Sequence, residues 1–108
     1  MTTFEMSTTR LINLPSAVCV YGIVADAYED EDDEGKYVEY VGEFGGEFEN
    51  DHEFRITVWL DGVKLYIRAG FDDEDFVEED HCKPENIDKC LDKICKNLDK
   101  YIKEQIGE

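Results

Sequence analysis

Thiol and imidazole side chains are the groups in this chain with the most obvious potential for metal or nucleophilic chemistry. His81, Cys82, Cys90 and Cys95 are of the types that ligate zinc. Their spacing argues against a site, because Cys90 and Cys95 lie five apart in a helical pattern, about 140° round the axis, and no C-x-x-C pair exists. We expect Cys90, Cys95 and the strand residue Cys19 to be core residues, Cys82 to be a candidate exposed thiol, and no metal site.

Carboxylates give a partial match to a calcium loop. Asp30, Asp32, Glu34 and Gly35 fit the first half of an EF-hand, but the twelfth position is Val41, where a bidentate Glu is required. The following segment is also a predicted strand. The pattern excludes an EF-hand and leaves only weak, non-specific binding of divalent cations.

Catalytic patterns are missing from the sequence. His52 and His81 have no recognisable partner for a nucleophilic triad, and Gly42 to Gly46 lacks the pattern of a phosphate loop. Abundant carboxylates do not by themselves make a perturbed acid pair. We expect a protein that is not an enzyme and has no cofactor.

Acidic residues dominate the chain. Residues 26–80 carry 21 Asp and Glu against 4 Lys and Arg, which accounts for the entire formal charge of −17. The remaining residues carry equal numbers of acids and bases. This sign excludes direct binding to nucleic acid or an anionic membrane as the default, and favours a basic protein surface, cations or simple solubility.

Many of these acids lie in predicted strands and short loops, which would fix their positions. A rigid array of carboxylates can stand in for phosphates, because duplex DNA carries one charge per about 1.7 Å of axis. The residues expected to contact a basic partner are Glu29, Asp30, Glu31, Asp32, Asp33, Glu34, Glu39, Glu43, Glu47, Glu49, Asp51, Glu53, Asp72, Asp73, Glu74, Asp75, Glu78, Glu79 and Asp80.

The elements that would hold this array are four antiparallel strands, at about 17–28, 36–44, 47–60 and 63–70, rich in β-branched and aromatic residues. Residues 29–35 contain six consecutive acids and are expected to form a solvated loop. The turn before the third strand is either Gly45-Gly46 or Asn50-Asp51.

The clearest local pattern is a hairpin around Asp61-Gly62, a type I′ turn pair. The predicted register pairs Leu60 with Val63, Val58 with Leu65, Ile56 with Ile67, and Phe54 with Ala69, which makes one face wholly apolar. On the other face, Arg55, Trp59, Lys64, Tyr66 and Arg68 are expected to pair with neighbouring acids or to form a contact patch.

A C-terminal helix is predicted at about 84–106. Pro84 suits its first turn, and apolar residues recur at spacings of three and four. The chain is thus expected to be one α+β domain, 1–108, in which a four-stranded antiparallel meander carries one long C-terminal helix on one face. Its parts are 1–15 (N-terminal arm or edge strand), 16–70 (sheet), 71–82 (acidic connector) and 83–106 (helix).

In small size, extreme acidity, α+β pattern and carboxylates mounted over residues 26–80, the chain resembles acidic DNA-mimic inhibitors of phages and mobile elements, of the anti-CRISPR or anti-restriction type. This is a resemblance of physical character, without a shared motif. It implies a stoichiometric inhibitor that occupies the basic DNA- or RNA-binding groove of a host defence nuclease. The expected partner is therefore a nucleic-acid-binding protein, a CRISPR or restriction nuclease complex.

A second hypothesis is an acidic immunity protein or secretion chaperone for one dedicated partner, with apolar anchors such as Phe71, Phe76 or Trp59. Because residues 1–10 lack a basic start followed by an apolar run, we expect a cytoplasmic location, in the host cell if the gene is phage-borne. No membrane association is expected, and the oligomeric state stays open.

Overall fold

A computed structural model describes residues 2–5, 11–20, 22–33, 35–44, 52–61, 64–71 and 77–105 of the chain. The elements are β1 (Thr2–Glu5), β2 (Leu11–Leu14), β3 (Ala17–Val20), β4 (Ile23–Asp32), β5 (Gly35–Phe44), β6 (His52–Asp61), β7 (Lys64–Phe71), β8 (Val77–Cys82), a 3₁₀ turn (Pro84–Asn86) and α1 (Ile87–Gln105).

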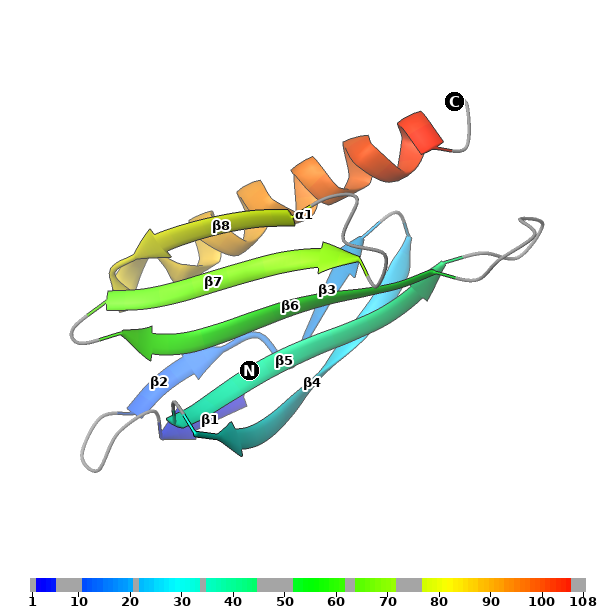
Figure 1. Ribbon diagram of the computed structural model, residues 1–108. Coiled ribbons are helices and arrows are strands. Elements are labelled where there is room, and N and C mark those ends of the chain that lie inside the picture. Colours follow the sequence, from blue (N-terminus) through cyan, green and yellow to red (C-terminus); the bar gives the residue numbers. More distant parts are fainter. Residues whose placement is uncertain are drawn as a thin grey trace.

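Strands β3 to β8 form one antiparallel sheet in sequence order, a six-stranded meander. The sheet curls round α1, which lies against one face and contacts β3, β7 and β8 (Figure 1). Strands β1 and β2 pair with each other in a separate two-stranded sheet. The α+β class and the C-terminal helix on one face are confirmed.

The core lies between the helix and the facing side of the sheet. Alternate residues of β5, β6 and β7 supply it, including Val38, Tyr40, Ile56 and Ile67, all fully buried. The helix contributes its apolar stripe, of which Ile94, Leu98 and Ile102 are fully buried.

The prediction of four strands is wrong, and three segments differ from it. Residues 17–28 divide into β3 and β4 at Gly22, whose φ of 76° is rare for other residues. Most of the supposed acidic loop, residues 29–32, continues β4 and pairs with β5 as far as Asp32 and Gly35. The last part of the supposed acidic connector forms the edge strand β8.

Neighbouring elements give these acidic stretches charged or hydrogen-bonding partners. Across the β4–β5 ladder, Glu31 lies opposite Lys36 and Asp30 lies opposite Tyr37. In β8, the side chains of Glu78 and Asp80 face the helix and bond Asn97 and Lys93 there.

The predicted register of β6 and β7 is wrong by two residues. The structure pairs Leu60 with Leu65, Val58 with Ile67, Ile56 with Ala69 and Phe54 with Phe71. A shift of two keeps every apolar group on the same face, so the alternation cannot detect it. The observed register sets Arg55 opposite Gly70 rather than Arg68, and Asp61 opposite Lys64.

The N-terminal segment, left open as an arm or edge strand, contains β1 and β2, and Leu14 reaches the core. The hydroxyl of the buried Tyr40 donates to the Pro15 carbonyl at 2.7 Å and ties this segment to the sheet. The alternative turns at Gly45-Gly46 and Asn50-Asp51 lie outside the described residues.

Candidate functional site

Many of the polar and charged side chains of the sheet lie on the face that points away from α1. Strand alternation puts the odd-numbered residues of β5 and β6 on this open face, together with their cross-strand partners on β4, β7 and β8. We call it the open face.

A row of aromatic rings crosses the open face. Tyr37, Trp59, Tyr66 and His81 are consecutive cross-strand neighbours on β5, β6, β7 and β8. Their ring centroids are 5.9, 5.4 and 4.9 Å apart in that order, within the range of favourable aromatic pairs. The four rings form a continuous aromatic wall across these strands.

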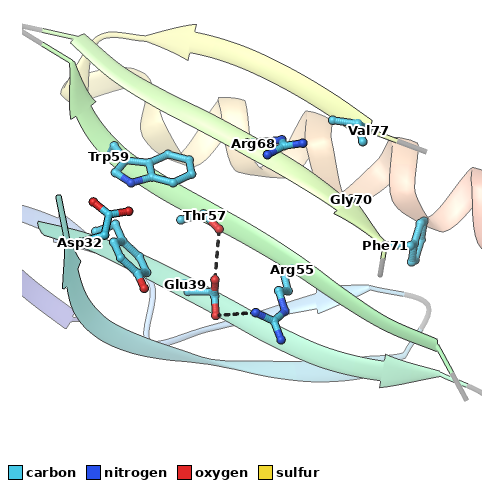
Figure 2. Close-up of a pocket in the computed structure, with 10 residues that line it drawn as sticks. Asp32, Glu39, Arg55, Thr57, Trp59, Arg68, Gly70, Phe71 and Val77 are labelled. Atoms are coloured by element: carbon cyan, nitrogen blue, oxygen red, sulfur yellow. Dashed lines mark hydrogen bonds and ion pairs between the residues drawn. The ribbon is translucent and has the colours of Figure 1, made fainter. Parts of the chain in front are cut away.

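A hollow of about 530 Å³ lies beside this wall. The next two cross-strand pairs along β6 and β7 are Thr57 with Arg68 and Arg55 with Gly70, and the small Thr57 and Gly70 leave the surface low there. Figure 2 shows Trp59 and Asp32 at one end of the hollow, Val77 and Phe71 at the other, and Arg68 between them. The volume falls within the range of about 300–1,000 Å³ typical of ligand pockets.

Glu39 occupies the middle of the hollow. Its side chain is 23% exposed, and its carboxylate accepts a hydrogen bond from the Thr57 hydroxyl at 3.4 Å and lies 3.7 Å from the Arg55 guanidinium (Figure 2). Both contacts are long for bonds to a charged group, which normally span about 2.7–2.9 Å. Glu39 is therefore a half-buried carboxylate with weak internal partners.

The two arginines of the open face are each held by another acid. Arg55 donates from Nε to Glu53 at 2.6 Å and makes a second contact to the same carboxylate. Arg68 lies 3.7 Å from Glu79. The prediction that these arginines pair with neighbouring acids is confirmed.

Two polar groups at the Asp32 end of the hollow are perturbed. Partial burial and the nearby carboxylates of Asp30 and Glu39 raise the pKa of Tyr37. The indole Nε1 of Trp59 is buried and has no hydrogen-bond partner among the described residues. Both observations mark this end as a crowded, acidic and aromatic environment.

A second candidate feature is the acidic ribbon, residues 29–33, at the end of the β4–β5 hairpin. Their carboxylates are Glu29, Asp30, Glu31, Asp32 and Asp33, all exposed. Glu29 to Asp32 lie on the paired strand β4, so the ladder fixes the backbone that carries them. The backbone N–H of Glu31 also donates to Asp30 at 2.8 Å.

The other acids expected to contact a partner are distributed differently. Glu43 and Glu79 are exposed, whereas Glu53, Glu78 and Asp80 are partly buried and bonded within the protein. Those outside the described residues are Glu34, Glu47, Glu49, Asp51, Asp72, Asp73, Glu74 and Asp75.

The cysteines do not form a metal centre in the part of the chain that the structure describes, where no group of three His, Cys, Asp or Glu residues could hold an ion. The expectation that Cys19 is buried is wrong, because it lies on the outer side of the edge strand β3 and is exposed. Burial raises the pKa of Cys90 to about 12 and of Cys95 to about 11. Cys82, expected as an exposed thiol, is half-buried.

Sequence reasoning missed the hollow and the aromatic row. The available signal for the hollow was the presence of the small residues Thr57 and Gly70 among large residues on the polar side of β6 and β7, and the aromatic row appears only in the correct register. No helix among the described residues is long and apolar enough to cross a membrane.

Comparison with protein-family models, curated proteins and solved structures finds no match to this chain.

Proposed function

We propose that the protein is a stoichiometric acidic inhibitor that acts as a nucleic-acid mimic and occupies the basic groove of a host defence nuclease of the CRISPR or restriction type. The observation that carries the proposal is the acidic ribbon. Its consecutive exposed carboxylates are mounted largely on a hydrogen-bonded strand, so their spacing is held by the fold.

The charge spacing of the ribbon supports mimicry. A strand advances about 3.4 Å per residue and its side chains alternate between two faces, so the five acids present about one charge per 3.4 Å over both faces together and about one per 6.8 Å on each face. Each strand of duplex DNA carries one charge per about 3.4 Å of axis. A lysine- or arginine-lined groove that encloses both faces of the ribbon would therefore meet a linear charge density similar to that of one DNA strand.

The uneven distribution of charge would orient the protein as it approaches such a groove. The outer face of α1 carries Lys89, Lys93, Lys96, Lys100 and Lys103. The acids are concentrated instead in residues 26–80, outside α1. Long-range attraction would turn the ribbon, rather than the helix, toward a basic surface.

The test uses the purified protein as bait in a bacterial lysate that contains CRISPR and restriction complexes. Retained complexes are eluted with salt or with duplex DNA, and their nuclease activity is measured with and without the inhibitor. The proposal expects a nuclease that is released by both and is inhibited at equimolar protein.

The decisive variant reverses three charges on the ribbon, Asp30→Lys, Asp32→Lys and Asp33→Lys. The matched control reverses Asp88, Asp92 and Glu104 on the exposed face of α1. Each reversal adds two charges, so both variants change from −17 to −11. Loss of inhibition in the ribbon variant alone supports the proposal. Normal inhibition by the ribbon variant, or equal loss in both, refutes the ribbon as the contact.

The aromatic row favours a second candidate, an immunity protein or secretion chaperone for one dedicated partner. Trp and Tyr are enriched among the residues that dominate binding energies at protein interfaces. This candidate expects one partner that survives both high-salt and DNA washes.

A further inference from the structure

We propose that the hollow of the open face is a receptor site for an arginine side chain of the partner, with Glu39 as its anion and Trp59 and Tyr37 as its aromatic wall. The partner's basic character comes from the proposed function. The site itself is inferred from the contacts around Glu39.

Glu39 can accept a new guanidinium without leaving an internal cation unpaired. Its contact with Arg55 is long, at 3.7 Å, and Arg55 is held more closely by Glu53. Its bond from Thr57 is also long, at 3.4 Å. A half-buried carboxylate in this state gains from a well-placed donor, since charge-assisted bonds are about twice as strong as neutral ones.

The wall of the hollow suits a planar cation. Tyr37 and Trp59 line it together, with ring centroids 5.9 Å apart and planes inclined at 46°. A guanidinium can stack on an aromatic face and point its N–H groups at a carboxylate beyond the ring edge. Glu39 lies beside this wall, and Asp32 lies at the same end of the hollow (Figure 2).

The charge of the open face also favours a cation. Its described acids are Asp26, Asp30, Asp32, Glu39, Glu43, Glu53 and Glu79, whereas its Lys and Arg residues are Arg55, Lys64 and Arg68. An anionic ligand would have to approach two arginines that already have acid partners, through a surface with an excess of carboxylates. The same surface attracts a basic segment.

The experiment uses Trp59 as a reporter, because it is the single tryptophan of the chain. A five-residue peptide with one arginine among glycines is titrated at physiological salt, followed by Trp fluorescence and the indole N–H signal in NMR spectra. Matched peptides carry citrulline, which keeps the shape but lacks the charge, or lysine. We expect a saturable change with arginine, about tenfold weaker binding with citrulline, and a smaller loss with lysine.

Two substitutions then locate the anion. Glu39→Gln should weaken the arginine peptide about tenfold, whereas Glu43→Gln on the same face should change it less than about twofold, because distant exposed charges are screened. If Glu39→Gln does not fold, Glu39→Asp is used instead. Its side chain is one methylene shorter, so the carboxylate lies farther from the bound guanidinium and binding should weaken several-fold. Three results would overturn the proposal. They are equal binding of the arginine and citrulline peptides, equal effects of the two Gln variants, and no change in the fluorescence or indole N–H signal of Trp59.

Failure of this site and failure of the mimic function are distinguishable. The receptor site is measured with peptides and does not need the nuclease, and Glu39 lies outside the acidic ribbon. Inhibition that depends on the ribbon with no arginine-specific signal at Trp59 rejects the receptor site alone. An arginine-specific signal without nuclease inhibition rejects the mimic function alone.

Discussion

Gly42 provides the sharpest test of the packing. It is buried on β5, opposite Phe54 on β6. A methyl group added there would lie 2.4 Å from Cζ and 2.5 Å from Cε1 of Phe54, and 3.2 Å from Cβ of Ala25. Carbon atoms normally pack at about 3.5–4.0 Å. The Gly42→Ala substitution therefore forces Phe54 to move.

The expected cost follows from the surroundings of Phe54. Its ring is fully buried and meets Phe71 edge-on, with centroids 6.5 Å apart, so it has little room to rotate. Overpacking a filled core lowers the free energy of unfolding by about 1–3 kcal/mol. Replacing glycine by alanine also reduces the conformational entropy of the unfolded chain, which offsets about 0.4–1 kcal/mol of this loss. We expect a net loss of about 1.3 kcal/mol in the free energy of unfolding, or about 6 °C in Tm.

Urea denaturation of a double-mutant cycle tests the mechanism. Phe54→Leu shortens the obstructing ring, so the double variant should recover at least about 1 kcal/mol relative to additivity. Gly35→Ala is the control: no atom lies within 4 Å of the added group, but φ is +124°, so its cost arises from backbone strain. Phe54→Leu should not rescue it. A Gly42→Ala variant within about 0.5 kcal/mol of wild type would falsify the β5–β6 pairing at this position.

Two further predictions concern titratable groups. The backbone N–H of the next residue lowers the pKa of Asp80, and the Lys93 ammonium also lowers it. Its contribution to stability is then present above a pH of about 4 and disappears as the pH falls through the lowered folded value. Asp80→Asn should cost up to about 1 kcal/mol at pH 7 and almost nothing at pH 2, measured by urea denaturation, and a difference independent of pH would contradict this. Iodoacetamide at pH 8 should label the exposed Cys19 well before Cys90 and Cys95, whose burial raises their pKa to about 12 and 11, as peptide mass spectrometry can show. Equal labelling rates in the folded protein would contradict the burial of these two thiols.

Local sequence patterns were sufficient to predict the elements that pack through an apolar side. The alternation in β6 and β7 identified the buried face, and the stripe of Ile94, Leu98 and Ile102 identified the helix. Each of these elements has one apolar side and one polar side, so its periodicity can be recognised in the sequence without knowing what it packs against.

Elements that depend on distant partners were missed. The acidic β8 becomes a strand when α1 supplies Asn97 and Lys93 to its inward-facing acids. In β4, Glu31 and Asp30 come to lie opposite Lys36 and Tyr37 only after the hairpin closes. No local property of a run of Asp and Glu indicates such compensation.

The sequence predicted the acidic residues of the candidate site but not the hollow in which Glu39 lies. Glu39 was among the expected contacts, but its long bonds, the aromatic wall and the hollow depend on the register of three strands. A two-residue slip keeps the same residues on each face but changes every cross-strand pair, so a prediction can identify the buried residues correctly and still miss the neighbours that form the site.

The alternating pattern of β5 and β6 has a consequence for adaptation. Even-numbered residues such as Tyr40 and Ile56 hold the fold, while odd-numbered residues such as Glu39 and Trp59 face outward. Substitutions at most of the outward-facing positions of these strands are therefore expected to leave the fold intact. The exposed surface of the sheet can then change during evolution while its buried side keeps the same architecture.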